Sequence, residues 1–121
     1  MWVKSLPDCP EIIANDLCAL RELLHPDHDG QEVGYSLAHA VIAPGQATLP
    51  HHLEGASEVY YLISGSGRMR IGDETRNVQA GDAILIPPGA VQFLENTGTI
   101  PITFLAIVEP AWKPQIDVRD G

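Results

Sequence analysis

The chain has 121 residues, of which 45% are hydrophobic and 19% charged, and its formal net charge at pH 7 is −9. This length suits one ordinary hydrophobic core, so a single domain is expected. The negative charge, which no cluster of Lys or Arg offsets, argues against nucleic acid and anionic membrane surfaces as partners. The sequence shows no secretory leader and no apolar run of about 20 residues, so we expect a cytoplasmic protein.

Residues 1–30 are the least regular part of the sequence, and we treat them as an N-terminal arm. The apolar positions of "IIANDLCALRELL" fit a helix or a strand, so periodicity leaves the choice open. The Asp, Pro and Gly residues of "HPDHDG" predict a loop, in which His25 and His28 are expected to be solvated. Both cysteines are expected to be free thiols, with Cys18 buried.

From Gly34 onward, short strand-like runs alternate with turn signals. The runs are "YSLAHAVI", "EVYYLIS", "RMRI", "RNVQ", "AILI", "AVQFLE" and "PITFLAIVE". Seven or eight short strands at this spacing predict an antiparallel β-sandwich or barrel over residues 31–110. Residues 111–121 are expected to form a C-terminal tail.

Several of these strands are apolar on both faces. In "EVYYLIS", one face has Glu58, Tyr60 and Leu62, and the other has only large apolar side chains. A strand of this kind needs a cover on its outer face, either the N-terminal segment or a second subunit. We therefore expect a homodimer.

Two blocks of the sequence place glycines at fixed distances from polar residues. The first block consists of Gly45, His51, Leu53, Glu58 and Gly65, and the second of Gly81, Pro87, Gly89, Gln92 and Asn96. The glycines fall at strand junctions, where a sharp bend or a positive φ disfavours a residue with a Cβ. The two blocks resemble the paired motifs of the cupin superfamily, in its small single-domain form. This resemblance implies an all-β antiparallel barrel of jelly-roll type and one cupin domain over residues 1–121.

The resemblance also implies a site. In metal-binding cupins the first motif supplies two histidines and a glutamate, and the second motif supplies a third histidine. Here Leu53 and Gln92 occupy two of the histidine positions, while His51 and Glu58 are unchanged. The resemblance thus implies a divalent transition metal bound by His51, Glu58 and Gln92, with Mn²⁺, Fe²⁺, Zn²⁺ and Ni²⁺ all open. Glu58 and Tyr60 are the candidates for proton transfer.

Two further histidines adjoin these motifs. Strand alternation predicts that His52 faces away from His51, whereas His39 is a candidate for a fourth ligand. The rest of the cavity is expected to be lined by Tyr60, Leu62, Leu53 and Leu94.

Three kinds of function remain open from the sequence. The first is a metal-dependent cupin enzyme for a small molecule, whether a dioxygenase, a decarboxylase or an isomerase. The second is a binding or sensory module that holds a small metabolite in the same cavity, with a metal-free polar pocket as one form. The third is a structural protein that assembles through its apolar strands. The fold alone does not choose among them.

Overall fold

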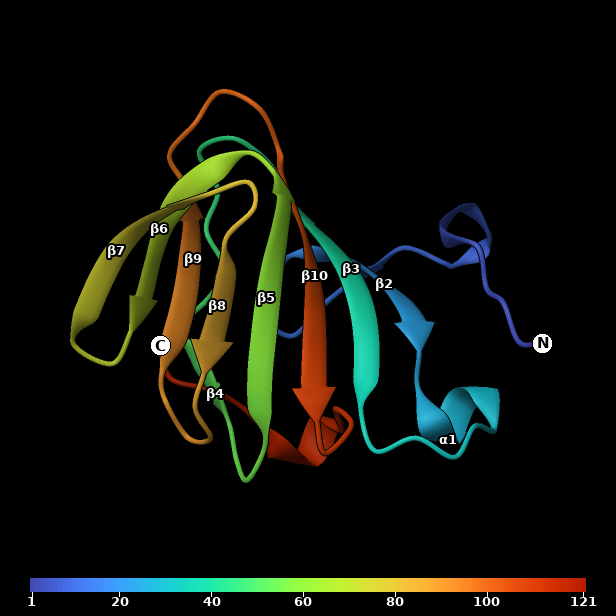
Figure 1. The fold of residues 1–121 in the computed structure, drawn as a ribbon. Helices are drawn as coiled ribbons and strands as arrows, with labels where there is room; N and C mark the ends of the chain where they lie inside the picture. Colours follow the sequence, from blue (N-terminus) through green and yellow to red (C-terminus); the bar gives the residue numbers. More distant parts are fainter.

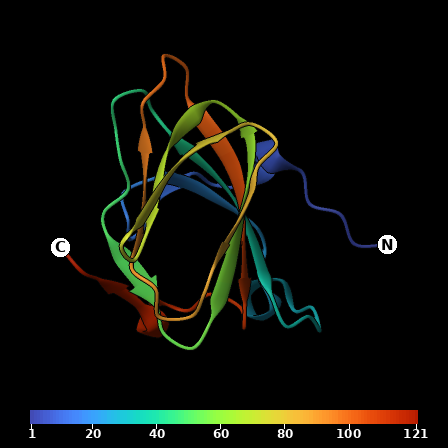
Figure 2. The same ribbon diagram turned by 60° about the vertical axis from the view of Figure 1, so that its left-hand side comes forward.

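Two antiparallel sheets face each other and form the barrel seen in Figures 1 and 2. The computed structural model describes residues 1–121. The first sheet has six strands, in the order β1 (Ile12–Ile13), β2 (Ala19–Leu24), β3 (Ser36–Ile42), β10 (Ile102–Glu109), β5 (Ser57–Ser64) and β8 (Ala83–Ile86). The second has five, in the order β11 (Asp117–Arg119), β4 (His51–Leu53), β9 (Gln92–Asn96), β6 (Ser66–Ile71) and β7 (Glu74–Gln79).

The helical segments are short. They are the 3-10 helices η1 (Leu6–Asp8) and η2 (Pro114–Ile116) and the single-turn α-helix α1 (Pro26–Asp29). None of them is long and apolar enough to cross a membrane.

The expected all-β antiparallel architecture is confirmed, and each of the seven runs identified in the sequence overlaps a strand. The segment whose periodicity was ambiguous forms β1 and β2. Because β2 pairs along β3, part of the expected N-terminal arm belongs to the six-stranded sheet. Likewise β11, in the expected C-terminal tail, pairs with β4. Both ends of the chain therefore add strands to the barrel.

The core lies between the sheets and follows from strand alternation. On β5, Glu58 and Tyr60 point inward and are buried, whereas Tyr61 and Ile63 are exposed. The inward side chains of both sheets form a cluster of 12 buried residues, which includes Leu62. Burial of this apolar surface is the main stabilising contribution to such a fold.

His25 differs from the sequence expectation. It is 2% exposed, and its Nε2 lies 2.6 Å from the carbonyl oxygen of Trp112. Its Nδ1 accepts a hydrogen bond from the backbone N–H of Asp27 at the start of α1. The expectation of a solvated His25 is therefore wrong, because local sequence does not show that Trp112 returns to this end of the barrel. His28 is exposed, as expected.

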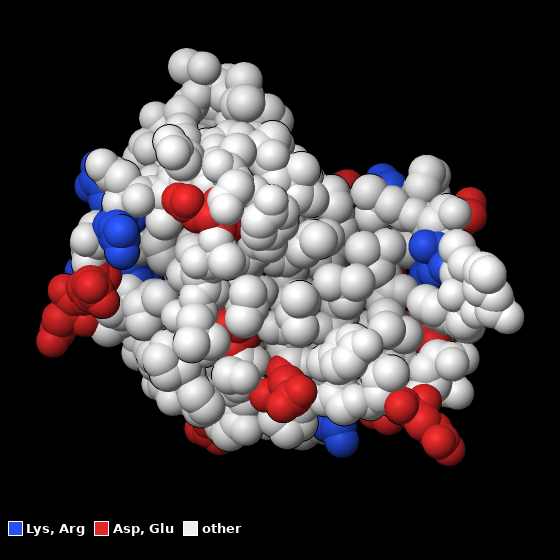
Figure 3. All heavy atoms as spheres, viewed as in Figure 1, with Lys and Arg blue, Asp and Glu red and all other residues white.

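Around β5, β8 and β10, the outer face of the six-stranded sheet is apolar and uncovered. Its large side chains that are more than a third exposed are Tyr61, Ile63, Leu85 and Ile107. Figure 3 shows mainly uncharged atoms over the middle of this face. The N-terminal segment lies beyond β2 instead (Figure 1), where Lys4 pairs with Asp29 and Arg21 donates to the carbonyl oxygen of Leu6.

At Gly67, β6 passes so close to its neighbours that no side chain fits. A Cβ at this position would overlap the carbonyl oxygen of Glu95 on β9 and lie 2.8 Å from Cδ1 of Ile102. The backbone of β6 cannot move away without weakening its hydrogen bonds to β9.

We expect Gly67→Ala to lower the free energy of unfolding by about 2–3 kcal/mol, because the added methyl group overpacks the space between strands. Gly34→Ala is the matched control. No atom lies within 4 Å of a Cβ at Gly34, so its effect should stay within about 0.5 kcal/mol. Urea denaturation followed by circular dichroism measures both, and equal effects would contradict the close approach at Gly67.

Candidate functional site

His51, Glu58 and Gln92 are buried between the two sheets. His51 on β4 and Gln92 on β9 are partners in the antiparallel pair, while Glu58 lies on β5 of the facing sheet. The amide Nε2 of Gln92 donates a hydrogen bond of 2.9 Å to Oε1 of Glu58, which links the sheets. His51 and Glu58 line the same cavity. The fold thus brings residues of both sequence motifs into one interior region.

The hydrogen bonds of His51 define which ring nitrogen is free. Nδ1 lies 3.0 Å from the carbonyl oxygen of Leu49. A carbonyl oxygen only accepts, so Nδ1 carries the proton and the neutral ring has its lone pair on Nε2. A histidine that donates from one nitrogen to a backbone carbonyl and offers the other is the usual arrangement of a metal ligand.

The carboxyl group of Glu58 is in an environment that disfavours its charge. Burial raises the pKa of Glu58 to about 8, against the opposing effect of the Gln92 hydrogen bond. The nearby carboxylates of Asp16 and Asp117 raise it further. Without a cation beside it, Glu58 is therefore mostly protonated at pH 7, and it exchanges protons in the pH range suited to general acid–base catalysis.

Two other buried groups stay protonated. Burial raises the pKa of the Tyr60 hydroxyl, and the Glu58 carboxyl adds to the effect. Burial, followed by the charge of Asp16, raises the pKa of the Cys18 thiol. Tyr60 thus keeps its hydroxyl proton and can donate a hydrogen bond in the cavity, and Cys18 is neither a nucleophile nor a thiolate ligand at neutral pH. As expected, both cysteines are free and Cys18 is buried.

The cavity at this site has a volume of about 180 Å³ and mostly apolar walls. Its lining includes four carboxyl groups, from Asp16, Glu22, Glu58 and Asp117, and no Lys or Arg. Asp117 is fixed by hydrogen bonds from Trp112 Nε1 at 2.8 Å and Asn15 Nδ2 at 3.0 Å. Such a lining attracts cations and repels anions.

The donor types at this site suit a divalent metal ion, although the ligand atoms of Asp16, His51 and Glu58 do not form a group within 4.8 Å of one another as those of Glu22, His25 and His28 do. His51 offers a free lone pair and Glu58 a carboxylate, and the buried Oε1 of Gln92 has no hydrogen-bond partner. A buried acceptor without a partner is costly, and a cation would satisfy it. The amide nitrogen of Gln92 faces Glu58 in the structure. Gln92 therefore orients Glu58, and its oxygen joins the same ion only if the amide turns over.

Some residues expected at the site lie elsewhere. His39 pairs with Leu105 on β10 and lies on the face of β3 opposite Ala38 and Ala40, which line the cavity. The proposal of His39 as a fourth ligand is therefore wrong, because the register of β3 directs it outward. His52 also faces outward, as strand alternation predicts.

His52 has its own partners on that outer side. Its Nδ1 lies 2.8 Å from Oδ2 of Asp120, and this bond raises the pKa of His52. Among the apolar residues expected in the cavity wall, Tyr60 and Leu53 do line it. Leu62 and Leu94 do not, because they are packed in the core between the sheets.

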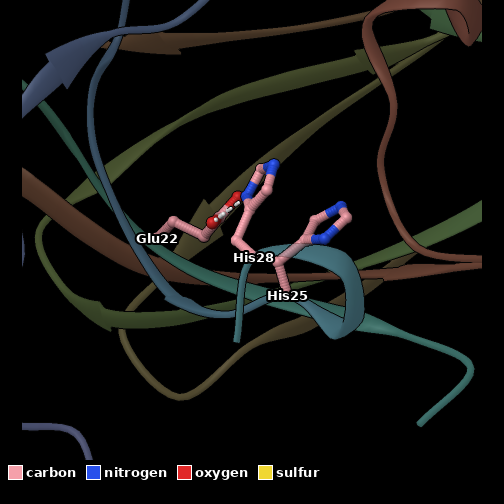
Figure 4. A group of neighbouring side chains, drawn as sticks. All are labelled: Glu22, His25 and His28. Atoms are coloured by element: carbon pink, nitrogen blue, oxygen red, sulfur yellow. Dashed lines mark hydrogen bonds and ion pairs between the residues drawn. The ribbon is translucent and has the colours of Figure 1, made fainter. Parts of the chain in front are cut away.

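A second group of possible metal ligands lies near the end of β2. Glu22, His25 and His28 present ligand atoms within 4.8 Å of one another (Figure 4). However, His28 Nδ1 already bonds to Glu22 Oε1 at 2.6 Å, and both nitrogens of His25 are hydrogen-bonded. The two rings also stack, with centroids 4.3 Å apart and planes at 23°. Their lone pairs therefore do not converge, and a metal would require a ring to turn.

A wider hollow of about 970 Å³ lies between β6, β7 and β8. Its charged residues have both signs, with Arg68, Arg76 and Glu74 all exposed. These groups are solvated and present no buried constellation. The smaller cavity at His51 and Glu58 is the better candidate for chemistry.

The sequence analysis missed Asp16, Asp117 and Trp112 as parts of this site. All three belong to segments taken as an arm and a tail. The Asn15–Asp16 pair before β2 consists of turn-forming residues, but its position inside the barrel depends on tertiary packing. No local signal placed it there.

Comparisons with known proteins agree with the fold. A family model of the cupin domain matches residues 38–108. An uncharacterized protein of Methanocaldococcus jannaschii is 38% identical over 102 residues, which span 84% of this chain and 80% of that protein. The oxalate-binding protein of Thermotoga maritima is 31% identical over 67 residues, 55% of this chain and 55% of that protein.

Solved structures give the same result. The crystal structure of a predicted oxalate decarboxylase from Thermotoga maritima superposes with a TM-score of 0.78 and 22% sequence identity. The match covers 91% of this chain and 99% of the other. At this identity, the likeness shows the fold.

In chelator-treated protein, we expect Glu58→Gln to raise the free energy of unfolding above that of the wild type at pH 8–9, with little difference at pH 5. The pKa of Glu58 is raised from 4.5 to about 8, so the folded state holds the proton more tightly than the unfolded state. Wild-type stability therefore falls as the pH rises from about 5 to about 8, by at most about 4–5 kcal/mol. Urea denaturation across this range measures the difference, and exposed Glu74→Gln is the control. A difference that does not change with pH would refute the buried, proton-holding Glu58.

Proposed function

Because the chain belongs to the cupin family, we propose that it holds a divalent metal ion through His51 and Glu58, with Gln92 beside them, and binds a small oxygen-bearing molecule there. The observation that supports this best is the free Nε2 of His51 in a cavity that contains four carboxyl groups and no Lys or Arg. Mn²⁺, Fe²⁺, Zn²⁺ and Ni²⁺ are the candidates from the donor set.

We propose a small carboxylate as the ligand. The cavity has a volume of about 180 Å³. A water molecule takes up about 30 Å³ in the liquid, so this volume has room for about six non-hydrogen atoms. One relative is named for binding oxalate. A carboxylate that entered the metal-free cavity would meet Asp16 and Glu58 with no cationic side chain to balance them, so binding should require the metal.

The residues around the metal have distinct tasks in this proposal. When bound, the metal supplies a Lewis acid that polarises an oxygen of the ligand. His51 keeps its lone pair directed inward through its bond to Leu49. Glu58 is either a ligand or a proton carrier, and Tyr60 remains protonated as a donor in either case. The apolar wall, including Trp112, limits the access of water.

The reaction class stays open between decarboxylation, dioxygenation and isomerisation. A non-catalytic binding protein is the second candidate, which the name of the oxalate-binding relative favours. Oxalate consumption by the metal-loaded protein distinguishes the two. An enzyme loses turnover in Glu58→Gln, whereas a binding protein consumes nothing at any metal loading.

Tag-free protein that has been treated with a chelator should take up about one Mn²⁺, Fe²⁺ or Zn²⁺ per chain. We expect His51→Ala to weaken metal binding by at least about tenfold, because it removes a direct ligand. His52→Ala is the matched control: it removes the neighbouring imidazole on the outer side of β4 and should leave the affinity unchanged. Isothermal titration calorimetry measures both.

Oxalate should then bind to the metal-loaded wild type and not to the metal-free protein. Equal metal binding by wild type and His51→Ala would refute the site. Oxalate binding that survives removal of the metal would refute the role of the metal in holding the ligand.

We also propose that two copies pair through the outer face of the six-stranded sheet. The exposed side chains of Tyr61, Ile63, Leu85 and Ile107 form an apolar surface there, and the N-terminal segment does not cover it. Leu85→Glu should convert a dimer into a monomer, because it places a charge in an apolar contact. Sedimentation velocity measures the mass, with Val3→Glu as an exposed control on the N-terminal segment. A wild-type monomer at all accessible concentrations would refute the pairing.

A further inference from the structure

We infer that Asp16, on the turn between β1 and β2, is a third side-chain ligand of the metal and makes the site rich in oxygen donors. The inference rests on the proposed function, since it concerns the same ion. It assigns a role to a residue outside both sequence motifs. Four observations support it.

The first observation is the position of the carboxylate. Asp16 is 6% exposed and lines the same cavity as His51 and Glu58. Its Oδ1 accepts a hydrogen bond of 3.2 Å from the backbone N–H of Cys18. Its Oδ2 faces Nε2 of His51 at 3.9 Å. A buried carboxylate is costly unless it is paired or bound to a cation, and no Lys or Arg lines this cavity.

The second observation is the size of the gap between His51 and Asp16. In the neutral ring with Nδ1 protonated, Nε2 of His51 presents a lone pair to a carboxylate oxygen, so neither atom donates a proton to the other. Their separation of 3.9 Å is too long for a hydrogen bond. It is slightly less than two metal–ligand bonds of about 2.1 Å laid end to end, so one ion can contact both atoms.

The third observation is how the backbone fixes the two groups together. The N–H of Leu49 donates to the carbonyl oxygen of Asp16 at 2.9 Å, and the carbonyl oxygen of Leu49 accepts from His51 Nδ1. One residue thus holds both proposed ligands. The turn that carries Asp16 also has an unfavourable backbone, because Leu17 has a φ of 75°. Strained backbone conformations of this kind cluster at functional sites.

The fourth observation is independent of Asp16. Oε1 of Gln92 is fully buried, has no hydrogen-bond partner, and belongs to the amide that contacts Glu58. A bound cation would offset the charge of Asp16, and it would also pair with this acceptor once the amide of Gln92 turns over. A purely structural role for Asp16 would account only for its bond to Cys18.

The donor set has a consequence for the choice of metal. Once Glu58 turns toward His51 and Asp16, one imidazole and two carboxylates form a harder set than one with several imidazoles, and oxygen donors favour Mn²⁺ or Fe²⁺ relative to Zn²⁺ or Ni²⁺. Asp16→His, which adds an imidazole, should shift the preference toward Zn²⁺. This shift is specific to a residue that contacts the ion.

The test compares Mn²⁺ binding to chelator-treated, tag-free wild type, Asp16→Asn and Glu22→Gln by calorimetry, with electron paramagnetic resonance to detect bound Mn²⁺. Asn keeps an oxygen that can accept from Cys18, so Asp16→Asn should fold. Circular dichroism and thermal melting with chelator check this. Glu22→Gln is the matched control, because it removes one carboxylate from the lining of the same cavity.

We expect Asp16→Asn to weaken Mn²⁺ binding by at least about tenfold and Glu22→Gln by less than about threefold. Similar small losses in both variants would overturn the assignment of Asp16 while leaving the proposed function intact. A larger loss in Glu22→Gln would also overturn it and would move the ion to the group of Glu22, His25 and His28. A wild type that binds no divalent ion would refute both the proposed function and this inference.

For Asp16→His, the measured ratio of Zn²⁺ affinity to Mn²⁺ affinity should rise by at least about tenfold over that of the wild type. An unchanged ratio would refute direct contact between Asp16 and the ion. A loss of Mn²⁺ binding in Asp16→Asn would then reflect only the lost charge of Asp16.

Discussion

The carboxyl group of Glu58, buried between two sheets, is the constraint on which the rest of the site depends. A charge in this position requires a counter-charge, and the hydrogen bond from Gln92 is only a partial substitute. No Lys or Arg lines the cavity, so the protein has two ways to satisfy Glu58. It is protonated, as its raised pKa indicates, or it faces a bound cation. In our proposal, the proton and the metal compete for the carboxyl oxygens of Glu58, and metal binding releases a proton at neutral pH.

The strand pairing places the site residues through a few backbone contacts. β4 and β9 pair at His51 and Gln92, and β5 presents Glu58 from the opposite sheet. Other residues of the site come from the two ends of the chain. The turn before β2 carries Asp16, and Trp112 precedes η2 and β11. Both additions contribute residues to the lining of the cavity. The segments at the ends thus have more than a packing role.

The sequence predicted the barrel well and the site in part. Strand runs bounded by glycines gave the core elements from Ser36 to Glu109, because alternation and turn chemistry are local properties. The same alternation correctly separated His51 from His52. It misplaced His39, since the face that a strand turns inward depends on its register with its neighbours. The positions of Asp16 and His25 were missed for a related reason: they depend on contacts with Leu49 and Trp112, which are distant in sequence.

The absence of cationic side chains in the cavity also orders the proposed binding events. An anion that approached the metal-free cavity would meet carboxyl groups from Asp16, Glu58 and Asp117 and would gain no compensating contact. A metal changes the sign of the local potential and offers open coordination positions to oxygen atoms. In this proposal the cation binds first, and the affinity for a small carboxylate becomes a measure of metal occupancy. A site with an Arg in the wall would lack this order, because it would hold the anion without any ion. The residues that replace two motif histidines are neutral here, and the charges that remain in the cavity wall are carboxylates. These charges support an order of binding in which the metal enters before the small carboxylate.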